Sequence, residues 1–190
     1  MIVDKKREIL FAATIIFGKF GFHGATMEEI AKEAGIGKGT IYGYFSSKEI
    51  LFYEMIIYVL KEYERGMEET LNTNKTLEER LGDFAEFHKE QLNKYLDISQ
   101  IFVWEKEVLS MDLMEEIKKE KSRLFNYMKN IIKEEKNKGE LRKNLDEELA
   151  AIVIIGSINQ FYGQKLCYER IPFQEVYGDK LIETLMRGLV

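Results

Sequence analysis

Apolar residues recur every three or four positions along nearly the whole chain, which is the spacing of an amphipathic α-helix. The first helix is expected to run from about Asp4 to Gly21, and its inward face comprises Ile9, Ala13, Ile16 and Phe20. We find no stretch that alternates between apolar and polar residues as a half-buried strand does. The pattern therefore predicts an all-α protein of about nine helices.

Capping residues mark where several of these helices begin. Thr26 and Glu29 have the spacing of a capping box, and so do Thr76 and Glu79. The other expected helix starts are Ser46 or Ser47, Asp97, Asp112, Asn144 and the segment after Pro172. The first three helices form a small unit over residues 1–46, and the remaining helices form a larger body over residues 47–190.

The stretch GIGKGTIYGY, residues 35–44, has two interpretations: a phosphate-binding loop or a turn between two DNA-reading helices. A nucleotide P-loop places lysine directly before Ser or Thr, whereas Gly39 separates Lys38 from Thr40 here. P-loops and dinucleotide-binding loops also follow a strand, and the segment before Gly35 is a capped helix instead. The sequence therefore argues against a nucleotide-binding loop.

The same stretch satisfies the spacing of a helix-turn-helix. Ala31 is small enough for close helix packing, Gly35 tolerates the left-handed turn, and Ile41 anchors the second helix. With Ile41 and Phe45 inward, the remaining side chains of this helix face outward. The residues expected to contact DNA are Thr26, Lys38, Gly39, Thr40, Tyr42, Gly43, Tyr44 and Lys48. The alternative is a plain helical hairpin with a solvated polar face.

Charge along the chain supports a polyanionic partner for the N-terminal part. The 190 residues carry a net charge of −5, but residues 1–48 hold seven Lys or Arg against five Asp or Glu.

The single cysteine, Cys167, excludes an intramolecular disulfide and suits a reducing cytoplasm. The longest apolar run is too short to span a bilayer, and residues 1–20 do not have the pattern of a signal peptide.

The segment FGKFGFHGATMEEIAKEAGIGKGTIYGYFSSKEILF, from Phe17 to Phe52, resembles the DNA-binding region of the tetracycline-repressor (TetR) family. The match is continuous from Ile9 to about Phe52. The resemblance implies a cytoplasmic homodimer, usually a repressor, that leaves its palindromic operator when a small molecule binds the C-terminal body. Gly43 departs from the family, in which that position often carries a larger side chain.

The C-terminal body contains a segment that is apolar on nearly all sides, Leu149–Ile158, and a helix that is apolar all round is buried all round. A second subunit is expected to cover one of its faces, as the family resemblance also implies. The candidate interface residues are Ile152, Gly156, Gly163, Leu181 and Leu185. The alternative is a monomeric core.

Aromatic and methionine residues with a few polar tips predict an effector pocket in the same body. The candidates are Phe84, Phe87, His88, Phe102, Trp104, Glu105, Tyr127, Met128, Asn159 and Tyr162. His88 lies on an apolar helical stripe, so we expect a buried, hydrogen-bonded histidine. No partner has the spacing of a metal ligand, so neither a metal nor a cofactor is expected.

Two kinds of effector remain open from the sequence. Glu105 or Glu107 facing the cavity would favour a lipophilic cation. The segment GELRKNLDEELAAIVIIGSINQFY is instead similar to the corresponding stretch of family members that sense fatty acyl-CoA. The alternatives to a regulator are a helical enzyme and an adaptor that does not bind DNA. No nucleophile–base pair or carboxylate dyad supports an enzyme.

Overall fold

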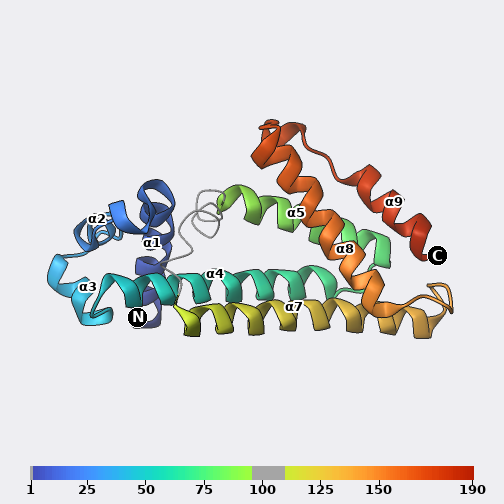
Figure 1. Cartoon of the computed structure of the whole chain (residues 1–190), viewed down its shortest axis with the longest axis horizontal. Coiled ribbons are helices and arrows are strands. Elements are labelled where there is room, and N and C mark those ends of the chain that lie inside the picture. Colours follow the sequence, from blue (N-terminus) through green and yellow to red (C-terminus); the bar gives the residue numbers. More distant parts are fainter. Residues whose placement is uncertain (1, 96–109) are drawn as a thin grey trace. The chain divides into compact units, whose positions relative to one another are not determined.

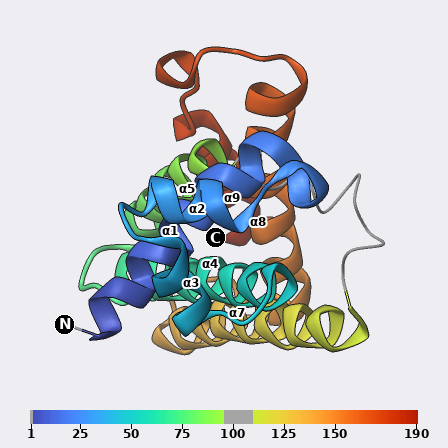
Figure 2. The ribbon, with the colours of Figure 1, turned by 90° about the vertical axis from the view of Figure 1, so that its left-hand side faces the viewer.

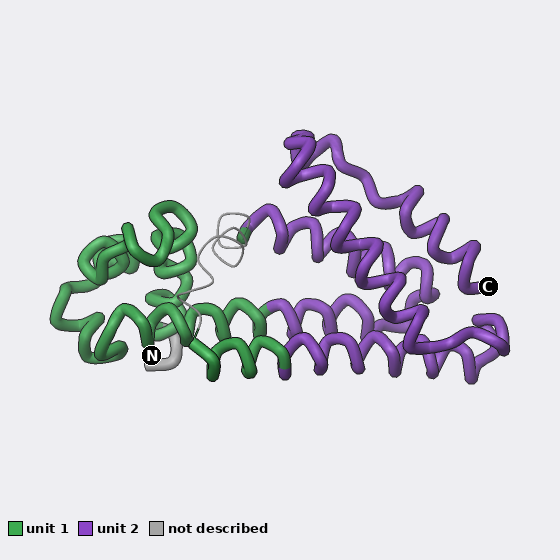
Figure 3. The backbone as a smooth tube through the Cα atoms, viewed as in Figure 1, with its two compact units in different colours: residues 1–62, 95–118 green, residues 63–94, 119–190 purple. Residues whose placement is uncertain are grey.

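The computed structural model describes residues 2–95 and 110–190 and divides the chain into two compact units (Figure 3). The first unit is built from residues 1–62 and 95–118, and the second from residues 63–94 and 119–190. Over the described ranges the regular elements are helices, eight of them α-helices, and no strand is present. The all-α prediction is confirmed. The helix expected from Asp97 lies outside the described residues.

Five helices contribute to the first unit (Figures 1 and 2). They are α1 (Ile2–Gly24), α2 (Met27–Glu33), α3 (Lys38–Tyr44) and the N-terminal parts of α4 (Lys48–Leu71) and α7 (Met111–Lys138). Their apolar faces share one core, in which Phe17, Ile30, Ile41 and Phe52 are almost completely buried. This core fixes α2 and α3 against the helices on either side of them in the sequence.

The sequence predicts that the first helix ends at Gly21, whereas α1 breaks at this residue and continues to Gly24. Gly21 interrupts the helical backbone at φ 68° and ψ 177°, and one further turn follows to Gly24. After this break Phe22 packs on the core, with its ring 6.0 Å from that of Phe17 and 5.1 Å from that of Phe52. Phe20 is 44% exposed, so its predicted inward position is wrong. The break at Gly21 redirects the chain and gives the core position to Phe22.

The capping boxes predicted at Thr26 and Thr76 are formed. The Thr26 hydroxyl accepts a hydrogen bond from the Glu29 backbone N–H, and the Glu29 carboxylate accepts from the Thr26 backbone N–H at 3.0 Å. Thr76 and Glu79 make the same reciprocal pair, in which the Thr76 backbone N–H lies 2.9 Å from the carboxylate. These bonds satisfy N–H groups that have no partner inside the helix, and so they begin α2 and α5.

Two other helix starts lie two residues away from the predicted cap. The Asp146 carboxylate, rather than Asn144, caps α8 by accepting from the Leu149 N–H at 2.8 Å. The Ser110 hydroxyl, rather than Asp112, accepts from the Leu113 N–H at 3.1 Å at the start of α7. In each case a neighbouring Ser or Asp occupies the capping position, one residue before the helix begins.

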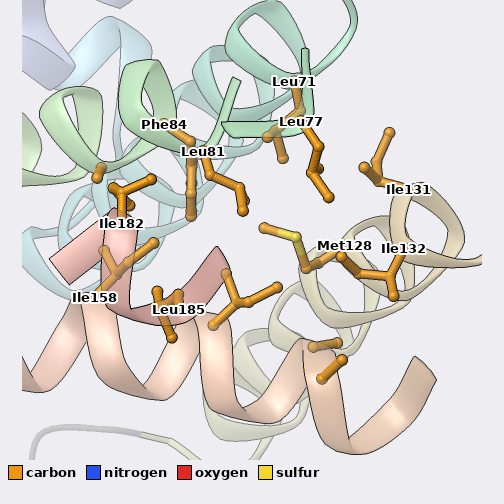
Figure 4. Packing of buried hydrophobic residues seen from close by; sticks show 14 of the residues in the cluster. Leu71, Leu77, Leu81, Phe84, Met128, Ile131, Ile132, Ile158, Ile182 and Leu185 are labelled. Carbon is orange, nitrogen blue, oxygen red and sulfur yellow. The ribbon is translucent and has the colours of Figure 1, made fainter. Parts of the chain in front are cut away.

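The second unit joins the C-terminal parts of α4 and α7 to three further helices. These are α5 (Leu77–Lys94), α8 (Glu147–Tyr162) and α9 (Asp179–Leu189), with a π-helical turn at Gly163–Tyr168 and a 3-10 turn at Phe173–Glu175. Leu81 and Phe84 of α5, Met128 of α7 and Leu185 of α9 meet in its core (Figure 4). None of the helices over the described ranges is long and apolar enough to cross a membrane.

Two glycines of the second unit allow an aromatic ring to approach the backbone closely. A Cβ atom added to Gly66 would lie 2.2 Å from the Phe87 ring, and one added to Gly178 would lie 2.3 Å from the Tyr162 hydroxyl. Carbon atoms do not pack that closely. The absence of a side chain at these two positions therefore sets where the two rings lie in the second unit.

Candidate DNA-binding and effector sites

The turn between α2 and α3 has the geometry that the sequence predicts. Gly35 adopts φ +64°, the left-handed conformation that glycine tolerates best. Across the turn, the Ile36 N–H donates to the Ala31 carbonyl at 2.9 Å. Ala31 and Ile41 are both buried, so the small residue and the anchor hold the two helices together as expected. These contacts make α2, the turn and α3 a helix-turn-helix.

The outer side of α3 presents polar side chains from a helix start that no side chain caps. Gly37 occupies the N-cap, and its carbonyl accepts from the Thr40 N–H at 2.9 Å. Lys38 and Thr40 are exposed, and Tyr42 is 43% exposed, whereas Tyr44 is half-buried against the core. A lysine, a hydroxyl and a phenol on one short exposed helix can hydrogen-bond to phosphate oxygens and base edges.

Gly39 and Gly43 leave the backbone of α3 open on the same helix. A Cβ atom added to either glycine would find no other atom within 4 Å apart from its immediate surroundings in the helix. Packing within the chain therefore does not require glycine at these positions. Glycine lowers the stability of a helix at these positions, and its bare backbone leaves room for something that approaches α3 from outside.

Two of the predicted contact residues are held by acidic side chains of α2. Lys38 pairs with Glu28, and this hydrogen bond raises the pKa of the lysine and lowers that of the carboxyl group. Both partners are exposed, so Lys38 can exchange Glu28 for another anion at small cost. Thr26 is less free, because its hydroxyl and its backbone N–H both contact the Glu29 carboxylate.

Lys48, the first residue of α4, points back at the end of α1. Its ammonium group donates to the Phe22 carbonyl at 2.8 Å and to the Ala25 carbonyl at 3.0 Å. The same nitrogen lies 4.6 Å from the centre of the Phe22 ring, within the range of a cation–π interaction. The sequence predicts Lys48 as a DNA contact, and its pairing with these two carbonyls could not be read from the sequence.

A group of polar side chains lies within the apolar second unit. The Tyr63 hydroxyl and His88 Nδ1 are 2.7 Å apart, and the His88 ring also lies next to Phe84 and Tyr162. Burial lowers the pKa of His88 to about 4, and Asn159 partly opposes that shift. The imidazole is therefore neutral near pH 7. Burial raises the pKa of Tyr63 and also raises that of Tyr162, to about 12.

The Tyr63 hydroxyl can donate to His88 Nδ1 or accept from it, and the tautomer of His88 decides which. If Tyr63 donates its single O–H to Nδ1, the proton of the neutral ring is on Nε2. Nε2 is buried and has no hydrogen bond of normal geometry among the described residues. An unmatched buried donor costs free energy, and an acceptor placed beside it would recover that cost.

The other predicted effector residues lie at different depths. Phe84, Met128 and Tyr162 are fully buried, Phe87 and Tyr127 are half-buried, and Asn159 is exposed. Phe102, Trp104 and Glu105 lie outside the described residues. Tyr63 was missed because it stands between Glu62 and Glu64 in a strongly charged segment. The structure thus brings His88, Phe84, Asn159 and Tyr162 together with Tyr63.

Pockets occur in both units. In the second unit, Tyr162 lines a pocket of about 640 Å³ with Ala85 and Ile182, and its rim is mostly acidic, with Glu78, Glu79, Asp83, Glu86 and Asp179. In the first unit, a more apolar pocket of about 850 Å³ is lined by Phe22, Ile50, Phe52 and Tyr53 among others. No group of three or more metal-ligating side chains occurs among the residues that the structure describes.

The predicted interface residues divide into an exposed and a buried set. On α8, Ile152 and Gly156 are exposed, and Leu149 and Val153 add further exposed aliphatic surface. Gly163 and Leu181 are half-buried, whereas Leu185 is packed in the core of its own chain. An exposed aliphatic face of this kind on one helix makes it a candidate interaction surface.

The helix-turn-helix and the helical second unit define a DNA-binding transcriptional regulator. A family model described as "Bacterial regulatory proteins, tetR family" matches residues 9–55, and one described as "Tetracyclin repressor-like, C-terminal domain" matches residues 74–163. The chain is 36% identical over 159 residues to the HTH-type transcriptional regulator YhgD of Bacillus subtilis. The aligned region covers 82% of this chain and 81% of the relative. The chain belongs to the TetR family of bacterial transcriptional regulators, whose members are not enzymes.

Further relatives extend the likeness over nearly the whole chain. The fatty acid metabolism regulator protein of B. subtilis is 27% identical over 185 residues, which is 97% of this chain and 95% of the relative. A TetR-family regulator from Mesorhizobium loti has the same fold, with a TM-score of 0.80, 23% identity and coverage of 98% and 97%. FadR from B. subtilis, solved in complex with stearoyl-CoA, gives a TM-score of 0.72 at 24% identity and 95% coverage of each chain.

Proposed function

We propose that this protein is a cytoplasmic repressor that binds a pseudo-palindromic DNA operator as a homodimer and leaves it when a fatty acyl-CoA binds. Residues 1–46 serve as the DNA-binding domain, and residues 47–190 bind the effector and the second subunit. The observation that carries the DNA-binding part is the exposed polar side of α3 behind a turn built on Gly35 and Ile41. A two-fold dimer would place two such helices in major grooves separated by one helical turn or a multiple of it.

The side chains of α3 divide into two roles at the operator. Lys38 exchanges Glu28 for a phosphate, which neutralises one DNA charge. Thr40 and Tyr42 face the groove and read base edges or hold phosphates, while Tyr44 supports the helix from the core side. Gly39 and Gly43 let the DNA backbone approach α3 closely, since neither carries a side chain. Thr26 orders the start of α2 through its capping box.

The dimer interface is proposed on the exposed face of α8. Leu149 and Ile152 are more than half exposed there, and Val153 lies beside them. Burying such side chains on association gains roughly 25 cal/mol per Å² of apolar surface. Gly156 and Gly163 let the backbones of two helices approach, and Leu181 of α9 extends the face. Ile152→Glu should give monomers by native mass spectrometry, while Lys121→Glu on an exposed side of α7 should leave the dimer intact.

The effector is proposed to be a molecule with a long apolar chain and a carbonyl group, and a fatty acyl-CoA has both. Two findings support this: the relative that regulates fatty acid metabolism, and the similar fold that holds stearoyl-CoA. Within this chain, the group of Tyr63, His88 and Asn159 leads from the exposed side of α8 into the apolar core. We assign the thioester carbonyl to the donor at His88 Nε2. Met67 and Met128 provide adaptable packing for the chain.

A lipophilic cation is the second candidate effector. The acidic rim of the pocket beside Tyr162 favours it, because carboxylates attract a cation and repel the phosphates of CoA. The two candidates differ in the charge that they bring to the second unit. Direct competition on one DNA complex can therefore decide between them.

The test measures the affinity of the protein for a duplex that the wild-type protein has selected from a random library. Stearoyl-CoA should weaken binding by about five- to a hundredfold, while CoA alone and a lipophilic cation such as rhodamine 6G should not. His88→Leu should retain its affinity for the duplex but lose the response to stearoyl-CoA. Release of the duplex by rhodamine 6G, and not by stearoyl-CoA, would favour the second candidate effector. Failure to select any duplex would refute the proposal that the protein binds a DNA operator.

A further inference from the structure

Lys48 begins α4, and its ammonium group is already engaged within the first unit. It makes two hydrogen bonds to carbonyl oxygens, at 2.8 Å to Phe22 and at 3.0 Å to Ala25. The third side of the ammonium group faces the Phe22 ring at 4.6 Å. A lysine has three N–H donors and no acceptor. These contacts leave little of its donor capacity for another anion.

The two carbonyls explain why a cation sits at this point. Phe22 belongs to the last turn of α1, and Ala25 follows the end of that helix. Carbonyl groups at a helix C-terminus have no partner inside the helix and carry partial negative charge. A lysine side chain from elsewhere in the fold can satisfy them. Lys48 therefore joins the start of α4 to the corner between α1 and α2.

We propose that Lys48 is a positioning residue for DNA binding and not a phosphate ligand. The corner that it holds leads directly into Thr26 and α2, so it sets where the helix-turn-helix begins. A contact with phosphate would require the ammonium group to give up both carbonyls and the aromatic ring. Lys38 differs in each respect: it is exposed, lies on α3 and pairs with an exposed carboxylate. The inference concerns the DNA-binding unit and does not depend on the identity of the effector.

The salt dependence of DNA binding separates the two roles. Log K falls as log salt rises, and each phosphate contact that a protein loses makes this negative slope less steep by about 0.9. A positioning residue contributes to the affinity but releases no counterion from the DNA, so its loss leaves the slope unchanged. Lys38→Met is the matched control, because it removes an exposed cation from the same unit.

The experiment measures the affinity of Lys48→Met, Lys48→Gln and Lys38→Met for the selected duplex over a range of salt, well below the melting temperature of each variant. We expect Lys48→Met to bind roughly tenfold more weakly, the loss of about one good contact, at an unchanged slope. Lys38→Met should make the slope less steep by about 0.9 for each subunit, and so by about 1.8 for the proposed homodimer. If Lys48→Met does not fold, Lys48→Gln provides the same comparison.

Two outcomes would overturn the proposal. A slope that becomes less steep for Lys48→Met by as much as for Lys38→Met would make Lys48 a phosphate ligand. An unchanged affinity with a lower melting temperature would make it a residue that only stabilises the fold. Lys48→Arg provides a further check: its guanidinium can reach the same two carbonyls, so it should recover part of the affinity that Lys48→Met loses.

Discussion

His88, one of the two histidines of the chain, should make the stability of the protein depend strongly on pH near neutrality. Its pKa falls from an unperturbed 6.5 to about 4 in the folded protein, so the unfolded chain takes up a proton more readily than the folded one. The contribution of His88 to the free energy of unfolding is then fully present above pH 6.5, and it is lost as the pH falls toward about 4. Each pKa unit corresponds to about 1.4 kcal/mol, so the whole contribution is on the order of 3 kcal/mol.

The assay is urea unfolding of three proteins at about pH 7 and about pH 5. Between these values the wild type should lose about 2 kcal/mol through His88, in addition to what its carboxyl groups contribute. His88→Gln should lose about 2 kcal/mol less than the wild type over the same interval. His23→Gln replaces the exposed second histidine and is the matched control. An equal pH dependence in His88→Gln and the wild type would refute a neutral, buried imidazole.

Two further pairs of substitutions test the helix-turn-helix. Gly43→Ala should raise the free energy of unfolding by about 0.5–1 kcal/mol, because its Cβ finds open space. Gly35→Ala should lower the same quantity by about 1 kcal/mol or more, because φ is positive there; equal effects in urea unfolding would contradict this reasoning. Thr26→Val and Thr76→Val should each cost about 1 kcal/mol through a lost cap. Only Thr26→Val should also weaken operator binding in a gel shift, so an equal loss in both variants would count against a role for the α2 start.

Local patterns in the sequence predicted the helices and their turn well. The capping boxes at Thr26 and Thr76 each use two residues three positions apart, so they can be recognised without tertiary information. Gly35 can also be recognised from local sequence, because a left-handed turn between two short helices nearly requires glycine. The predictions of Asn144 and Asp112 as helix caps were wrong because other capping residues stand within two positions of them. Sequence alone does not decide which of several neighbours adopts the extended cap conformation.

The contacts that depend on the tertiary fold could not be predicted. Lys48 reaches carbonyls that are 26 and 23 residues away, and backbone carbonyls leave no trace in the sequence. Phe20 and Phe22 exchange roles because of one backbone break at Gly21. His88 was correctly expected to point inward, but its partner Tyr63 lies 25 residues earlier among glutamates. Of the predicted contacts with DNA, with effector and between subunits, all stay predictions that the proposed experiments test.

The close approach of two glycines to two aromatic rings has a consequence for the evolution of this chain. Because a Cβ at Gly178 would collide with the Tyr162 hydroxyl, and one at Gly66 with the Phe87 ring, neither glycine can change alone without moving a ring. Related chains that keep both aromatic residues should keep both glycines, and chains with a larger residue at either glycine should carry a smaller one at its partner. Positions 66 and 87, and positions 162 and 178, should therefore vary as coupled pairs among close homologues.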